Sequence, residues 1–400
     1  MTDTTHRGCP VTHTDYTGTT PIYEHYALLN ADRERERFLF NDSTERGFYM
    51  LQRYEDVQAG FQQHQNWTTA VRRAQRPGIG EPLQPQDLNG EEHLKLRKIL
   101  NQFFAPAAVR RLEPLATQRC IELIEELKPK GSCDFVAEFA IRYPTDLFLA
   151  LLGLPVSDGE QFLEWSEDMF SAMLAGEPER AAAAKKNIIE YFEAALEDRT
   201  ANPGDPETDM VTRLLEARID DEPLTREQIH TILLTLMLAG LDTTRSALGY
   251  IYTHLATHDE HREEIVEDPD LIGKAVEEFL RLYPLVFQAG REVQSDQEFE
   301  GLELKKGDVM WMGIGQANRD PRKFDDPDEF IIDRPGANQH LAFGGGPHRC
   351  LGMHLARLEL KVVLEQWHER IPEYRIAEGA ELTERGGQLT LSTLPLEWEV

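Results

Sequence analysis

Cysteine is scarce in this chain. Its 400 residues include four cysteines: Cys9, Cys120, Cys133 and Cys350. No two of them form a C-x-x-C pair, which argues against a zinc ribbon or a dithiol redox site. Four cysteines in a chain of this length also do not resemble a disulfide scaffold, so the composition indicates a reducing compartment.

Long apolar runs are also lacking. The longest, residues 229–241, is interrupted by threonines and is shorter than the roughly 20 residues with which a helix crosses a bilayer. The first six residues are polar and lack the apolar segment of a signal peptide. We therefore expect a soluble, cytoplasmic protein with no membrane partner.

Basic residues are outnumbered by acidic ones, 42 to 71, and the net charge is −29. A chain this negative is repelled by nucleic acids and anionic lipid surfaces, so neither is an expected partner. No repeat or low-complexity linker divides the sequence. We expect one domain over residues 1–400, large enough to enclose a ligand, with the threonine-rich residues 1–20 as a loosely ordered arm.

Hydrophobic periodicity predicts a mainly α-helical protein with a smaller β portion, an α+β fold. Strands concentrate at about 36–51, 291–315 and 372–400, and residues 66–89 form a long, proline-containing loop of the kind that is often functional. The main predicted helices cover residues 90–104, 106–127, 137–152, 158–175, 178–200 and 225–257.

The most informative stretch, residues 343–352, reads FGGGPHRCLG. Three glycines and a proline lead into Cys350, and the apolar spacing after it predicts an amphipathic helix. A cysteine at a helix start is favoured as a thiolate, and glycines without Cβ atoms let the backbone approach a large planar partner. On these residues alone, a buried and inert cysteine after a glycine-rich turn stays an alternative.

The predicted helix 225–257 is apolar almost all round and therefore central, and Thr225 with Gln228 matches a capping box at its start. Its middle, residues 239–244, reads AGLDTT. Glycine in a helix costs up to about 1 kcal/mol relative to alanine, and buried acids and hydroxyls are also unfavourable. One interpretation is close packing at Gly240, with threonines bonded back to helix carbonyls. The interpretation we favour is a notch opposite a bulky cofactor, with an acid–alcohol pair that relays protons.

Two further pairs share a helix face because of their spacing. His93 and Arg97 are four residues apart and suit a carboxylate or phosphate group, although an ordinary solvated basic face has the same spacing. Glu278 and Arg281 are three apart and predict an ion pair, which is worth little if exposed and is a structural anchor if buried.

In type and order, these four features resemble the cytochrome P-450 superfamily. The cysteine loop matches its haem-binding signature, completed by Gly352 and the Leu-Ala-Arg of residues 355–357. The resemblance covers nearly the whole chain, is nearest to the soluble bacterial members and is faintly similar to the camphor-hydroxylase branch. It implies the cytochrome P-450 fold, with haem b (iron protoporphyrin IX) between the long central helix and the cysteine-loop helix.

The resemblance also implies roles for individual residues. Cys350 would be the axial thiolate of the haem iron, in a loop that includes Phe343 and Gly344. Asp242 and Thr243 match the acid–alcohol pair that delivers protons during oxygen activation. The positions that usually bind the haem propionates are His93, Arg97, Arg291 and His348.

Further positions follow from the same resemblance. Ala239 and Gly240 would leave room for oxygen and substrate over the haem. The family's structural ion-pair network would comprise Glu278, Arg281 and Arg334. The expected pocket lies along the 66–89 loop and the lid helices near 165–175, and its mostly apolar residues are Trp67, Leu83, Leu236, Val286, Phe287 and Leu389. For Trp67 and Leu83, simply pinning the loop is the alternative.

The resulting prediction is a haem-thiolate monooxygenase, an oxidoreductase that activates dioxygen and hydroxylates a small apolar substrate. A terpenoid is favoured, with aromatic or steroid-like molecules as alternatives. The chain has no flavin or iron–sulfur module, so electrons are expected from NAD(P)H through a ferredoxin reductase and a ferredoxin. We expect a monomer with a ferredoxin-docking patch made of Lys95, Lys98, Arg110, Arg111, Arg349 and Arg357.

Three alternatives remain open. The first is a peroxygenase that uses hydrogen peroxide, although such enzymes usually lack the acid–alcohol pair found at Asp242 and Thr243. The second is a haem protein that binds or senses a ligand without catalysis. The third is a zinc site of Cys350, His348 and His354, whose spacing is not a usual zinc pattern.

Overall fold

The computed structural model describes residues 5–14, 22–69, 82–385 and 390–400. These residues cluster into two compact units. The sheet unit comprises residues 1–71, 249–350 and 375–394, and the helical unit comprises residues 72–248, 351–374 and 395–400. Across the described ranges, no helix is both long enough and apolar enough to cross a membrane.

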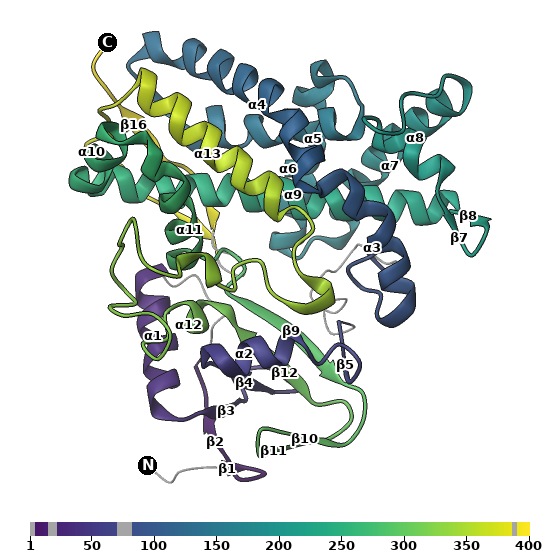
Figure 1. The fold of residues 1–400 in the computed structure, drawn as a ribbon, viewed down its shortest axis with the longest axis vertical. Helices are drawn as coiled ribbons and strands as arrows, with labels where there is room; N and C mark the ends of the chain where they lie inside the picture. The colour runs from purple at the N-terminus through teal and green to yellow at the C-terminus, as the bar shows by residue number, and fades with distance from the viewer. Residues whose placement is uncertain (1–4, 15–21, 70–81, 386–389) are drawn as a thin grey trace. The chain divides into compact units, whose positions relative to one another are not determined.

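The sheet unit is built on a seven-stranded sheet (Figure 1). The β2–β3 and β4–β12 pairs are parallel, and the other neighbours are antiparallel. β3 and β4 pair as an antiparallel hairpin inside the region 36–51, where the sequence predicted strands. The strand order is β1 (Thr5–His6), β2 (Cys9–Thr12), β3 (Phe38–Asn41), β4 (Phe48–Leu51), β12 (Val309–Gly313), β9 (Gln288–Val293) and β5 (Trp67–Thr68).

The N-terminal residues differ from the loosely ordered arm expected from composition. β1 pairs with β2, and β2 adds to β3 in parallel, so residues 5–12 belong to the sheet. The His6 ring stacks on Phe40 with centroids 3.8 Å apart. Tertiary pairing therefore orders a segment whose sequence carries no clear strand periodicity. Residues 1–4 and 15–20 of the predicted arm lie outside the described ranges.

Helices of the sheet unit pack against this sheet. α2 (Tyr54–Phe61) contacts β4 and β12, while α12 (Ile314–Asn318) contacts α2 and α1 (Ile22–Arg35). The core between them is apolar and includes Leu51 and Met310. The other elements of this unit are α10 (Asp259–Glu267), α11 (Ile272–Leu282), β10 (Gln297–Phe299), β11 (Leu302–Leu304), β13 (Arg375–Ile376), β14 (Glu384–Arg385) and β15 (Thr390–Leu391).

The helical unit contains most of the remaining helices (Figure 1). α6 packs along α5 and α7, and α13 packs along α4. β6 (Ser132–Asp134) pairs with β16 (Pro395–Glu397), and β7 (Arg218–Ile219) pairs with β8 (Glu222–Pro223). The helices are α3 (Gly90–Phe104), α4 (Pro106–Leu127), α5 (Arg142–Leu152), α6 (Gly159–Ala175), α7 (Pro178–Ala201), α8 (Met210–Glu216) and α13 (Met353–Arg370).

The mainly α-helical architecture with a smaller β portion is confirmed. Helix starts agree with prediction where proline occupies the first turn, at Pro106 and Pro178. The predicted helix 137–152 differs, because residues 136–140 form a π-helical turn before α5 begins at Arg142.

The long helix α9 (Arg226–Thr257) begins at the predicted capping box. The Thr225 N–H donates to Gln228 Oε1 at 2.9 Å, and the Gln228 N–H donates to Thr225 Oγ1 at 3.2 Å. Two backbone donors at the helix start are thereby satisfied. Residues 231–237 and 244–252 are buried, as expected for a central helix that is apolar on all sides.

Candidate active site

The cysteine loop folds tightly against the end of α2. Gly344 and Gly346 have φ values of +65° and +62°, a region that favours glycine. A Cβ at Gly345 would lie 3.0 Å from Phe61 Cβ, and one at Gly346 would collide with the Phe61 carbonyl oxygen. The loop closes where the Cys350 N–H donates to the Phe343 carbonyl at 2.9 Å. Glycine is therefore required here by backbone geometry.

Cys350 differs from the other three cysteines, because it alone is exposed. Burial raises the pKa of the Cys9 thiol to about 11 and that of Cys133 to about 12. Burial also raises the pKa of Cys120 strongly. These three thiols stay protonated and inert at neutral pH. The alternative of a buried cysteine at position 350 is therefore wrong.

In the middle of α9, Ala239 and Gly240 are exposed, although the turns on both sides are buried. A Cβ built at Gly240 would meet no atom within 4 Å. Close packing against protein atoms therefore does not explain this glycine, and the notch interpretation is favoured. The packing interpretation also predicted threonines bonded back to helix carbonyls. Such a bond is present, because Thr243 Oγ1 donates to the Ala239 carbonyl at 2.8 Å.

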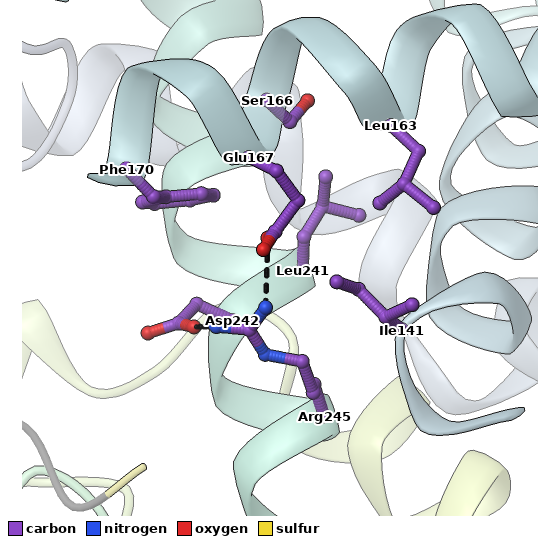
Figure 2. A pocket seen from close by; sticks show the side chains of 8 residues that line it. All are labelled: Ile141, Leu163, Ser166, Glu167, Phe170, Leu241, Asp242 and Arg245. Carbon is purple, nitrogen blue, oxygen red and sulfur yellow. Dashed lines mark hydrogen bonds and ion pairs between the residues drawn. The ribbon is translucent and has the colours of Figure 1, made fainter. Parts of the chain in front are cut away.

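Asp242 makes its ion pair with Arg245, one turn further along α9. Arg245 Nη1 also bonds Glu167 Oε1 on α6 at 2.7 Å. Figure 2 shows the guanidinium between the two carboxylates, at a small cavity. The carboxylate of Asp242 and the hydroxyl of Thr243 thus bond different partners. Sequence reasoning missed Arg245, although the i, i+3 rule that identified Glu278 and Arg281 also predicts this pair.

A second acid, Glu359 on α13, was also missed. Thr244 Oγ1 donates to Glu359 Oε2 at 3.0 Å, and both side chains are buried. Burial raises the pKa of Glu359 to about 8, against the opposing effect of the Thr244 hydrogen bond. The signal in the sequence was an acid four residues after Leu355 and three before Val362, on the apolar face of the helix.

The expected propionate-binding residues come from both units. In the helical unit, His93 is buried and Arg97 half-buried on α3, so the solvated-face interpretation does not fit His93. In the sheet unit, Arg291 is buried on β9 with its guanidinium carbon 5.9 Å from the Phe61 ring centroid. His348 lies in the cysteine loop itself.

The predicted structural network forms completely within the sheet unit. Glu278 receives hydrogen bonds from Arg281 at 2.7 and 2.8 Å and from Arg334 Nε at 2.8 Å. Arg281 also bonds the carbonyls of Asn318, Pro327 and Glu329. Desolvation lowers the pKa of Arg281, although Glu278 opposes this shift. The network fixes α11 to the chain segment that precedes the cysteine loop.

The expected pocket residues are mostly packed in cores. Trp67 is buried on β5, with its ring 5.0 Å from that of Phe299, and Leu83 belongs to the core of the helical unit. These positions favour the alternative that both residues pin the 66–89 loop. Leu236 and Phe287 are buried and Val286 is half-buried. Leu389 and residues 70–81 of the loop lie outside the described residues.

The expected basic patch is partly neutralised. Lys95 bonds Asp220 at 2.6 Å and Glu91 at 2.9 Å, and Arg111 lies 3.4 Å from Glu207. Arg357 donates to the Met353 carbonyl. The residues of the expected patch that are exposed to solvent are Lys98, Arg110, Arg111 and Arg349.

Comparisons with known proteins agree with this geometry. Residues 161–368 match the family model for cytochrome P450. A probable cytochrome P450 127A1 of Sinorhizobium fredii is 36% identical and aligns over 80% of this chain and 76% of its own length. The chain belongs to the cytochrome P450 family.

Other cytochromes P450 are similar along the chain. A steroid C26-monooxygenase of Mycolicibacterium smegmatis is 31% identical over 74% of this chain and 73% of its own. The crystal structure of CYP101J2 superimposes with a TM-score of 0.85 at 31% identity, covering 98% of this chain and 97% of that one. This P450 is thus a haem-thiolate monooxygenase of a bacterial type, and P450s of this family bind haem b through a cysteine thiolate.

The residues of this P450 fit haem b. A soft thiol is exposed at Cys350, and a strip without bulky side chains is exposed at Ala239 and Gly240. Imidazole and guanidinium groups of the kind that bind carboxylates are present at His93, Arg97 and Arg291. This donor set suits an iron porphyrin rather than the zinc site considered from the sequence.

Proposed function

We propose that this P450 hydroxylates a small apolar substrate with electrons from a ferredoxin, with Cys350 as the thiolate ligand of its haem. The proposal is supported most by the strip at Ala239 and Gly240. It is an exposed stretch in the middle of α9 between buried turns, and the acid–alcohol pair follows it closely. When bound, haem supplies the activation of dioxygen. Haem-propionate binding by His93, Arg97, Arg291 and His348 is part of the proposal.

In this proposal, two side chains of α9, Asp242 and Thr243, orient a water molecule and transfer protons. Thr243 releases its bond to the Ala239 carbonyl and orients a water molecule with its hydroxyl. Asp242 exchanges protons with that water. The peroxygenase alternative needs no such pair, so the presence of Asp242 and Thr243 favours the dioxygen-dependent reaction.

The carbon monoxide spectrum of the reduced protein tests the role of Cys350. A strongly red-shifted Soret band is expected in the native protein, because it requires thiolate ligation. Cys350→Ser should lose this band while Cys120→Ser keeps it. An unchanged band in the Cys350 variant would reject Cys350 as the ligand.

Reconstitution tests the electron supply and the role of Thr243. With a ferredoxin, its reductase and NAD(P)H, we expect hydroxylated product. Thr243→Ala should consume NAD(P)H but release hydrogen peroxide in place of product. Product from added hydrogen peroxide at equal rates in both proteins would favour the peroxygenase, and reduction without any product would favour a sensor.

The substrate class is proposed as a terpenoid, with steroid-like molecules next. The terpenoid rests on the faint camphor-hydroxylase likeness, and the steroid on the similarity to the steroid C26-monooxygenase of Mycolicibacterium smegmatis. A spectral-shift titration with terpenoid, steroid and aromatic panels separates them. The monomeric state and cytoplasmic location stay predictions, the first testable by sedimentation.

A further inference from the structure

The ion pair of Asp242 extends beyond α9. Arg245 joins Asp242 on its own helix to Glu167 on α6, whose side chain points toward the middle of α9 (Figure 2). Ser166 Oγ, next to Glu167, lies 3.6 Å from Met237 Sδ on α9, a second polar contact between the two helices. The guanidinium is therefore held from two helices at once.

Solvent access is lowest at the centre of this chain of charges, at Arg245. The side chain of Glu167 is 35% exposed, that of Asp242 13% and that of Arg245 7%. A buried guanidinium needs its charge and its donors satisfied. Two carboxylates satisfy Nη1 and Nη2, while Nε is buried without a partner. Removing either carboxylate would leave an incompletely paired cation, which would then turn toward the carboxylate that remains.

The cavity beside Arg245 supplies a polar contact point for water. It is lined by Ser166, Glu167, Asp242 and Arg245 and by apolar side chains that include Ile141 and Phe170. Its size admits about one water molecule. Polar groups that converge on such a space orient a water by two to four hydrogen bonds. The cavity is thus lined by both acids, Glu167 and the less exposed Asp242.

We propose that Glu167 and Arg245 are positioning residues, which together hold the Asp242 carboxylate in place for proton exchange. Glu167 acts on Asp242 only through Arg245. With Glu167 removed, Arg245 pairs with Asp242 alone and draws its carboxylate away from the Thr243 side of α9. This inference rests on the proposed role of Asp242 in proton exchange.

The neighbouring residue offers a matched control. Asp168 is the next carboxylate on α6 and is similarly exposed, but its ion pair is with Arg180 on α7. Asp168→Asn therefore removes one charge and one α6 ion pair without touching Arg245. Glu167→Gln removes the same charge one residue away and abolishes the ion pair with Arg245, leaving at most a neutral hydrogen bond from the guanidinium to the amide oxygen.

The test measures the share of consumed NAD(P)H that ends as hydrogen peroxide, together with the solvent kinetic isotope effect on product formation. Glu167→Gln and Arg245→Met should each raise the peroxide share several-fold and change the isotope effect, while Asp168→Asn leaves both unchanged. Arg245→Lys should restore part of the coupling, because it keeps one charged donor. Ligand affinity from spectral titration should stay within about twofold in the Glu167 variant.

A double-variant cycle decides whether Glu167 acts through Arg245. In the Arg245→Met background, Glu167→Gln should have no further effect on the peroxide share. An equal effect in both backgrounds, or an equal effect of Asp168→Asn, would overturn the proposal. A change in melting temperature without a change in isotope effect would also overturn it, because a merely structural contact gives that result.

Asp242→Asn distinguishes a failure of this inference from a failure of the proposed function on which it rests. If Asp242→Asn leaves the peroxide share unchanged, the proposed role of Asp242 fails. If Asp242→Asn raises the share but Glu167→Gln does not, the positioning role fails alone. Amide hydrogen exchange on α6 gives a readout without turnover, and we expect faster exchange in Glu167→Gln and Arg245→Met alike.

Discussion

At the residue scale, Glu359 shows how burial changes the chemistry of one side chain. Its carboxyl lies among α9 and α13 side chains and receives a hydrogen bond from Thr244. Burial raises the pKa of the Tyr143 hydroxyl, and the nearby Glu359 adds to this rise. Tyr143 Oη is buried without a partner. A pKa raised to about 8 means that Glu359 carries its proton at neutral pH. The acid therefore joins the two helices as a neutral group.

Glu359→Gln should flatten the pH dependence of stability. The folded pKa of about 8 lies above the unfolded value, about 4.3, so between them the native state binds more protons than the unfolded state. The free energy of unfolding therefore falls as pH rises through this window, by at most about 5 kcal/mol. Urea unfolding across the same window should show this slope in the native protein and lose it in the variant. Identical slopes would contradict a raised pKa at Glu359.

Gly240→Ala should separate stability from ligand binding. A Cβ there meets no protein atom within 4 Å, and alanine favours the helix by up to about 1 kcal/mol. The variant should unfold at higher urea concentration yet bind apolar ligands more weakly, because the methyl group enters the exposed strip. Gly273→Ala on α11, where a Cβ also meets nothing, is the control for the helix effect alone. Unchanged ligand affinity would reject the strip as part of the pocket.

At the element scale, the cysteine loop depends on α2, which lies far from it in the sequence. Gly345 and Gly346 fit because Phe61 occupies the space that their Cβ atoms would need, and Gly344 fits because its φ is +65°. The glycines predicted that the loop backbone closely approaches another group, but the apolar periodicity of the sequence could not identify Phe61 as a neighbour. Contacts between distant segments are set by tertiary packing.

Gly346→Ala should lower the haem content of the purified protein. Its Cβ would collide with the Phe61 carbonyl, and its φ of +62° is strained for alanine. Gly273→Ala on α11, outside the motif, is the control, because a Cβ there meets no atom within 4 Å. The haem-to-protein absorbance ratio measures the difference. Equal haem contents would show that the loop tolerates the displacement.

The helices were the elements that the sequence predicted best. α3, α4, α6 and α7 match the predicted ranges almost to the residue, because proline starts and apolar periodicity are local signals. β1 and β2 were missed because such short strands have little pattern of their own and are fixed by pairing, β1 with β2 and β2 with β3.

At the scale of the whole molecule, the charge distribution governs encounters with partners. A net charge of −29 repels an acidic electron carrier, so docking requires a local basic region. Lys98, Arg110 and Arg111 are exposed on α3 and α4, which contact each other in the helical unit. Lys95 is already paired with two acids, which narrows the patch expected from the sequence.

Charge reversal at Arg110 and Arg111 should slow reduction by the proposed ferredoxin partner by about tenfold at low salt without changing substrate affinity. The difference should shrink as salt is added, because exposed charges are screened. Lys186→Glu on α7, also exposed, is the control for a change in net charge. Stopped-flow reduction measures the rate, and equal rates in the native and doubly reversed proteins would reject this surface as the docking site.

The sequence by itself determined the family and the chemical elements of this protein. Cys350, the AGLDTT stretch and the Glu278–Arg281 spacing are local patterns, and their order along the chain is readable without coordinates. Only the tertiary structure decided the partners of these groups: Arg245 and Glu167 for Asp242, Glu359 for Thr244, and Phe61 for the glycine loop. The physical reason is that burial and pairing depend on which distant segments pack together, and these control charge, proton affinity and backbone freedom at each site.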